Sequence, residues 1–183
     1  MSRLPYLTKS DLPEEHEDLF EVDEEEPDDV LLNAHRAMAN NPRLLEAWGE
    51  WTWTVYDETG DERIRELAIL AVANEVESRY VWHQHVPLSI ENGVSPDEIL
   101  AISQREFEAF VPAEKAVLEY VTTFVTGSID DETHDGLKEF FTDDVVVAII
   151  FLASEYLQMS KVIDAMAVDL ETGFVGWELE RLE

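Results

Sequence analysis

The chain has 183 residues, 45% of them hydrophobic, which is enough for one domain with a substantial packed core. It contains no cysteine, which excludes disulfides, zinc–thiolate sites and thiol nucleophiles. Forty-two acidic residues stand against twelve basic ones, a formal net charge of −30, and no basic stripe is present to bind nucleic acid.

The acidic residues are spread over every segment of the chain. A nucleic-acid mimic or a binder of basic partners could carry such a charge, and so could a protein adapted to very high salt. The even spread favours the second explanation, because molar salt shortens the electrostatic screening length to about 3 Å and makes self-repulsion tolerable. We therefore expect a halophilic, acidic protein.

Residues 1–26 are expected to form an acidic, mostly irregular leader. Two arrangements are open, since the leader could wrap over its own domain or bind a neighbouring subunit. The segment lacks the long apolar core and cleavage site of a secretory signal. No apolar run in the chain reaches the roughly 18 residues of a membrane-spanning helix. We expect a cytoplasmic protein with no membrane partner.

Apolar residues recur at three- and four-residue intervals from residue 27 to 168, which predicts consecutive helices with short connections. Asn41 and Ser95 are typical N-cap residues, and Pro27 suits a first helical turn. The expected helices span about residues 27–38, 41–60, 61–73, 80–90, 95–104, 112–126, 130–141 and 143–168. The chain should be all-α, a single-domain helical bundle of about six to eight helices, followed by a tail at 169–183 that Trp177 could anchor.

Two histidines and one glutamate stand out as candidate functional residues. His83 and His85 are two positions apart on an expected helix, so their side chains point about 200° apart and cannot share a metal ion. We expect no metal site, and one histidine of the pair facing the interior. Glu66 borders an apolar helix face and, if half buried, needs a hydrogen-bond donor. A histidine from the next helix or an ion pair with Arg65 or Arg63 could supply it.

The sequence contains no GxGxxG, P-loop, G-x-S-x-G or EF-hand pattern. Nucleotide, phosphate and serine-hydrolase functions therefore have no motif to support them. No cofactor is expected.

Three segments in a fixed order resemble a known family. They read R-E-L-x-I-L within residues 63–73, Y-x-W-x-x-H within 78–88, and G-V-S-x-x-E-I within 91–99. Together they resemble the carboxymuconolactone decarboxylase family of the alkylhydroperoxidase D-like superfamily, with Asn92 where a small alanine is usual. The resemblance covers about residues 27–168. It implies an alkylhydroperoxidase D-like bundle that assembles as a homo-oligomer, whether dimer, trimer or hexamer.

Redox-active members of this superfamily use a glutamate, a C-x-x-C pair and a histidine as a proton relay for peroxide reduction. Glu66 and His85 match the glutamate and the histidine, whereas the two cysteine positions fall on Ser78 and Val81. The resemblance therefore implies a cysteine-free member without C-x-x-C peroxidase activity. A carboxylate–imidazole pair suited to proton transfer remains.

Two functions from different classes are open. The first is a cofactor-free lyase that decarboxylates a small carboxylated lactone or related acid, with His85 as general acid and Glu66 orienting its ring. The expected substrate contacts are Tyr80, Trp82, Arg79 and Arg65, with Arg63 as a further candidate. The second is a non-catalytic or small-molecule-binding helical protein that retains the scaffold.

Overall fold

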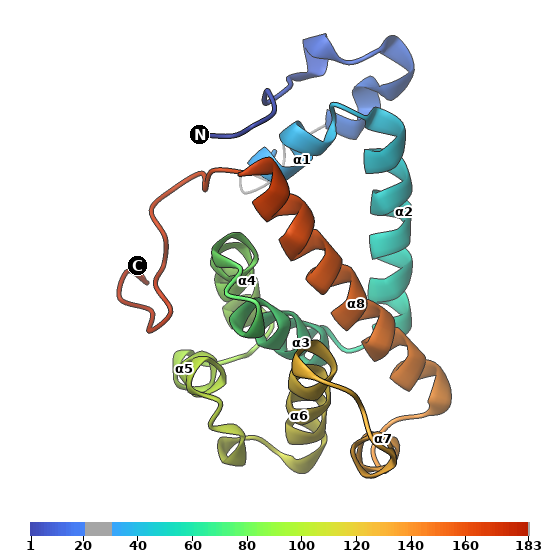
Figure 1. Cartoon of the computed structure of the whole chain (residues 1–183), viewed down its shortest axis with the longest axis vertical. Coiled ribbons are helices and arrows are strands. Elements are labelled where there is room, and N and C mark those ends of the chain that lie inside the picture. Colours follow the sequence, from blue (N-terminus) through green and yellow to red (C-terminus); the bar gives the residue numbers. More distant parts are fainter. Residues whose placement is uncertain (21–30, 183) are drawn as a thin grey trace.

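The computed structural model describes residues 1–20 and 31–182, and every regular element in these two ranges is a helix. The elements in chain order are η1 (Lys9–Asp11), η2 (Glu14–Phe20), α1 (Asn33–Met38), α2 (Pro42–Thr59), α3 (Glu62–Glu75), α4 (Arg79–Glu91), α5 (Pro96–Gln104), η3 (Phe107–Ala109), α6 (Pro112–Thr126), α7 (Asp131–Lys138) and α8 (Asp143–Met166). The expectation of an all-α bundle is confirmed (Figure 1).

Helix ends follow local sequence signals closely. The Asn41 side chain accepts the backbone N–H three residues on at the start of α2, and Asp61 does the same for α3. Ser95 and Glu98 form the expected capping box of α5. Gly60 ends α2 with φ +73°, a conformation that favours glycine. Helix α1 begins at Asn33 after the extended Leu32, so the helix expected from about residue 27 is wrong for residues 31–32, and Pro27 itself lies outside the described residues.

Helix α3 forms the centre of the bundle. Its residues from Leu67 to Ala73 are almost completely buried, and the helix packs against α4, α6 and α8. Helices α2 and α8 lie side by side along one flank of the molecule (Figure 1). Since α3 and α4 are consecutive and packed together, the side chains of Glu66 and His85 can meet inside the bundle.

The described part of the leader packs onto its own domain. Leu12 and Phe20 are buried against Ala39 and Leu45 at the junction of α1 and α2. The backbone N–H of Arg3 donates to a carbonyl at the end of α8 over 2.8 Å. Residues 1–20 therefore wrap over their own domain, which is one of the two arrangements that the sequence left open.

The C-terminal tail folds back over α4 and is tied to it by several contacts. Trp177 packs on Trp82 with ring centroids 5.2 Å apart, and the Trp82 indole N–H donates to the Gly176 carbonyl over 3.0 Å. The Glu171 carboxylate accepts hydrogen bonds from the Tyr80 hydroxyl, the Gln84 amide and a backbone N–H of α1. Trp177 thus contributes to anchoring the tail, as the sequence suggested.

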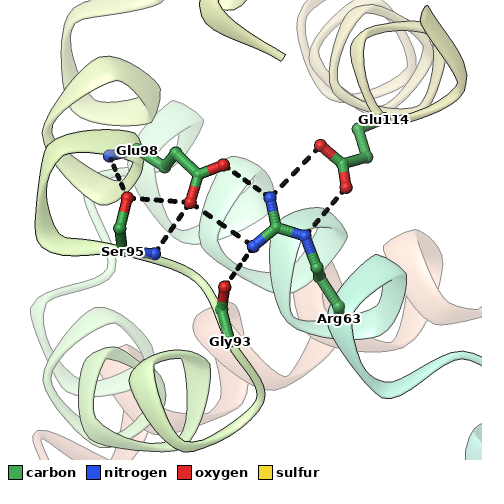
Figure 2. A network of polar contacts seen from close by, with 5 residues as sticks. All are labelled: Arg63, Gly93, Ser95, Glu98 and Glu114. Carbon is green, nitrogen blue, oxygen red and sulfur yellow. Dashed lines mark hydrogen bonds and ion pairs between the residues drawn. The ribbon is translucent and has the colours of Figure 1, made fainter. Parts of the chain in front are cut away.

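Arg63 braces the start of α3 against two other helices (Figure 2). Its Nη2 lies 2.6 Å from a Glu98 oxygen on α5, and its Nε lies 2.8 Å from a Glu114 oxygen on α6. Its Nη1 donates to the Gly93 carbonyl over 2.5 Å. These contacts occupy the Arg63 guanidinium within the protein, so the expectation that it could hold a substrate carboxylate is not supported.

Helix α8 is the one helix of the described residues that is long and apolar enough to cross a membrane by length and composition. In its most apolar window, 56% of the residues are buried inside the bundle. The helix contacts α2, α3, α4 and α6. A core helix of this kind is weak evidence for a membrane span.

Candidate functional site

Glu66 on α3 and His85 on α4 form a buried hydrogen-bonded pair. The Nδ1 atom of His85 lies 2.8 Å from Oε2 of Glu66. Only 2% of Glu66 and 8% of His85 are exposed to solvent. The contact expected from the sequence is therefore present, and of the two expected histidines it is His85 that faces the interior. The catalytic role of the pair stays a prediction.

The hydrogen bond sets the state of the imidazole ring. An ionised carboxylate only accepts, so Nδ1 carries the hydrogen and donates it to Glu66. In the neutral ring the lone pair is then on Nε2, for which the described residues supply no hydrogen-bond partner. Nε2 is thus the atom that could exchange a proton with a bound molecule.

Arg65 occupies the other side of the Glu66 carboxylate. Its Nε lies 3.6 Å from Oε1 of Glu66, and its guanidinium carbon lies 4.3 Å from the centre of the Tyr56 ring. The sequence left open whether Glu66 would pair with a histidine or with an arginine, and the structure shows both. Because a buried carboxylate is costly without compensation, this cation and the imidazole together stabilise it.

Two tyrosines that the sequence did not single out complete the surroundings of His85. The hydroxyls of Tyr56 and Tyr156 are hydrogen-bonded to each other. The Tyr156 ring packs at right angles to the His85 ring with centroids 5.0 Å apart. Burial raises the pKa of Tyr56 to about 12 and that of Tyr156 well above its ordinary value, so both phenols stay protonated.

Glu155 is a second buried carboxyl group close to this site. Only 4% of the residue is exposed, and its Oε1 accepts a hydrogen bond from the Thr52 hydroxyl on α2. Burial raises its pKa, more than the Thr52 hydroxyl and the Trp48 indole lower it. Its charge in turn disfavours ionisation of the neighbouring Tyr156.

The other expected substrate contacts hold the tail. The Arg79 guanidinium lies 4.6 Å from the Phe174 ring centre, and Trp82 is fully buried against Trp177. The Tyr80 hydroxyl donates to Glu171 over 2.7 Å. Arg65 is therefore the one residue of the expected set that the structure brings to Glu66. A sequence has no means of showing that the tail returns to cover this face of α4.

Ser78 and Val81 are the two residues that the resemblance places at the cysteine positions of redox-active members. Ser78 is the N-cap residue of α4, and Val81 is buried one turn before His85. Neither side chain can form a thiolate, so the surroundings of the dyad offer proton transfer without a sulfur nucleophile.

His83 lies on the tail side of α4 and shares no site with His85. Its Nε2 is 2.9 Å from the Thr172 hydroxyl, and its Nδ1 accepts the Val175 N–H over 3.2 Å. Among residues 1–20 and 31–182 there is no group of three histidine, aspartate or glutamate side chains that could hold a metal ion.

His83 is expected to make the packing of the tail sensitive to acid. Burial lowers its pKa, more than the charge of Glu171 raises it. Its contribution to stability is therefore complete above the unfolded pKa of 6.5 and is lost as the pH falls below that value. Tryptophan fluorescence and hydrogen exchange of residues 171–177 would report the loosening. His83→Gln should flatten this pH dependence, and an unchanged profile would contradict the role of His83.

One segment of the chain matches a known protein-family model. Residues 42–123 match the model of the carboxymuconolactone decarboxylase family. This range contains α2 to α5 and most of α6, and so both members of the Glu66–His85 pair. A search of curated proteins finds no match.

Solved structures similar to the chain share its fold over nearly the whole length. The debrominase Bmp8 without ligand superposes with a TM-score of 0.80 at 18% identity, covering 98% of this chain and 99% of that one. An uncharacterized peroxidase-related protein from Ralstonia eutropha, described as an alkylhydroperoxidase AhpD core, gives 0.79 at 15% identity, with 97% and 96% covered. Bmp8 bound to 2,3,4-tribromopyrrole gives 0.78 at 18% identity, with 94% and 93% covered.

Proposed function

We propose that the chain is a proton-transfer enzyme, because residues 42–123 match the model of the carboxymuconolactone decarboxylase family and the chain has the alkylhydroperoxidase D-like fold. Its proposed reaction is the cofactor-free decarboxylation of a small carboxylated lactone or related acid. The observation that carries this proposal is the buried hydrogen bond between Glu66 and His85. It leaves Nε2 of the imidazole uncommitted among the described residues.

The proposed reaction places one demand on the protein. When the bond between the carboxyl carbon and the ring carbon breaks, carbon dioxide leaves and the electron pair stays on the substrate. That electron-rich carbon needs a proton. In the proposed reaction His85 first takes a proton from solvent on Nε2, and as the imidazolium it then donates this proton to the carbon as general acid. Glu66 stabilises the imidazolium before the transfer, and Arg65 orients a carboxylate of the substrate.

The charge of the chain also affects substrate access. A net charge of −30 opposes the approach of an anionic acid, and salt at molar concentration screens that repulsion. We therefore retain the halophilic setting as part of the proposal. A homo-oligomeric assembly and a cytoplasmic location likewise stand as proposals.

A non-catalytic, small-molecule-binding role is the second candidate. The observation that favours it is the enclosure of the dyad, since Glu66 is only 2% exposed. The two surface grooves described lie elsewhere, one between α2 and α8 and one between α6 and α7. A substrate would have to reach the dyad by displacing side chains that cover it.

A substrate screen separates the two candidates. The full chain in molar potassium chloride is incubated with a series of carboxylated lactones and small unsaturated acids, and carbon dioxide release is measured. Hydrogen peroxide and 2,3,4-tribromopyrrole serve as comparison substrates. We expect decarboxylation of a lactone acid and no thiol-type peroxide reduction. Binding without turnover across the series would favour the second candidate, and peroxide reduction as the main activity would contradict the proposal.

A further inference from the structure

The paired hydroxyls of Tyr56 and Tyr156 hold one more hydrogen than they use. Each phenol carries one hydrogen, and the single bond between the two oxygens consumes one of them. The remaining O–H has no acceptor among the described residues. Tyr156 is 7% exposed and Tyr56 is partly buried, so this donor is largely shielded from water, and an unpaired donor there costs free energy.

A second donor without an acceptor lies beside the tyrosine pair. Nε of Arg65 is buried and makes no hydrogen bond within the described residues, because its distance of 3.6 Å to the Glu66 oxygen is too long for one. The Arg65 guanidinium stacks on the Tyr56 ring at 4.3 Å. The spare phenolic hydrogen and the arginine Nε–H therefore belong to one cluster.

The cluster is adjacent to the imidazole whose Nε2 is the proposed site of proton exchange. Tyr156 contacts the His85 ring directly, with ring centroids 5.0 Å apart. Residues from three elements, α2, α3 and α8, thus bring unpaired donors to the side of a proton carrier on α4. Donors at this place fit an oxygen atom of a bound molecule.

We propose that Tyr56, Tyr156 and Arg65 form an oxygen-binding subsite that receives a carbonyl or carboxylate oxygen of a small organic acid next to His85. This proposal rests on the proposed function for the class of ligand. Its test measures binding and does not require turnover. Neither tyrosine is assigned a role by the family match. Tyr56 comes from α2 and Tyr156 from α8, which lies beyond the matched residues 42–123.

In the proposed decarboxylation the subsite acts on the oxygen while His85 acts on carbon. As the carbon–carbon bond breaks, its electron pair delocalises through a conjugated ring double bond of the substrate onto the carbonyl oxygen of the lactone. The spare phenolic O–H donates a hydrogen bond to that oxygen without giving up its proton, because the pKa of each phenol is raised by burial. His85 then donates its proton to carbon, and the charge on oxygen collapses.

The test measures binding of a lactone acid that cannot readily decarboxylate. The saturated compound 5-oxotetrahydrofuran-2-carboxylate is titrated calorimetrically into the full chain in molar potassium chloride. Removing both hydroxyls with Tyr56→Phe and Tyr156→Phe together should weaken binding about 10- to 100-fold, the size expected for hydrogen bonds to a charged or strongly polarised acceptor. Each single change should weaken it less, since the remaining hydroxyl can still donate.

Tyr120→Phe is the matched control. Tyr120 is also buried, with 3% exposed, and its hydroxyl lies 3.3 Å from His134 between α6 and α7. This variant should bind the probe as the parent chain does. Thermal unfolding of all variants checks that phenylalanine fills the same space.

Every outcome supports or overturns the subsite. Failure of the subsite proposal can be distinguished from failure of the proposed function. Undiminished binding in the double variant, equal weakening by Tyr120→Phe, or no binding by the parent chain would each overturn it. Tyrosine-dependent binding without turnover of any acid supports the subsite and contradicts the decarboxylase proposal. Turnover that the double variant leaves unchanged supports the enzyme and overturns the subsite.

Discussion

Replacing His85 with alanine is expected to lower the turnover number of the proposed decarboxylation by about 10²- to 10⁴-fold, the usual contribution of a positioned general acid. The reason is geometric, because Nε2 of His85 is the proton carrier at the end of the hydrogen bond to Glu66. Turnover is measured by carbon dioxide release in molar potassium chloride. Equal turnover in the variant would remove the centre of the proposed mechanism.

Two further variants make this measurement specific. His83→Ala removes the neighbouring histidine, which contacts Thr172 and Val175 on the tail, and should leave turnover nearly unchanged at neutral pH. Glu66→Gln keeps the shape of the side chain and removes its charge, so the imidazolium loses its counter-ion. We expect Glu66→Gln to lower turnover less than His85→Ala, because the proton carrier itself remains.

The helices of this chain are predictable because their signals are local. The Ser95–Glu98 capping box and the N-cap at Asn41 act within one turn, so the sequence alone locates those ends. Helix α7 ends at Lys138, short of the Phe141 expected from periodicity, and residues 139–140 form a turn. Local sequence patterns thus predict the presence of a helix better than they predict the residue at which it ends.

The site is predictable only in part, because its members come from distant positions. Glu66 and His85 follow from the spacing of the family motifs, and α3 and α4 are neighbours in the chain. Tyr56 and Tyr156 are a hundred positions apart on different helices. In the sequence, Tyr156 cannot be distinguished from the apolar residues that recur along the same helix. The contact depends on how α2 packs on α8, which helical periodicity does not reveal.

Arg63 and Arg65 show why neighbouring residues of one type can have different roles. They are two positions apart on α3, so their side chains leave the helix in directions about 200° apart. Arg65 points to Glu66 and Tyr56, whereas Arg63 points to Glu98 and Glu114. The sequence treats both as candidates for a substrate carboxylate, and only the tertiary fold separates them.

Replacing Arg63 with methionine is expected to destabilise the protein by about 2–4 kcal/mol, a large effect for one residue. The Arg63 side chain is 25% exposed, and its guanidinium lies between two carboxylates that would be left facing each other without a cation. For a chain of this length the midpoint of thermal unfolding should fall by roughly 5–15 °C. Calorimetry or urea unfolding followed by circular dichroism measures the change.

Acid titration gives the same prediction an independent check (Figure 2). The Arg63 guanidinium is the largest cause that lowers the pKa of Glu98 from 4.5 to about 2. This stabilisation is complete above pH 4.5 and is lost as the pH falls through about 2. Arg63→Met should shrink the acid-dependent loss of stability without abolishing it, since Ser95 still donates to Glu98.

Lys115→Met, which removes an exposed ion pair on α6, is the matched control and should change stability little. If the two variants unfolded alike at neutral pH, Arg63 would not be the brace between α3, α5 and α6 that its hydrogen bonds indicate.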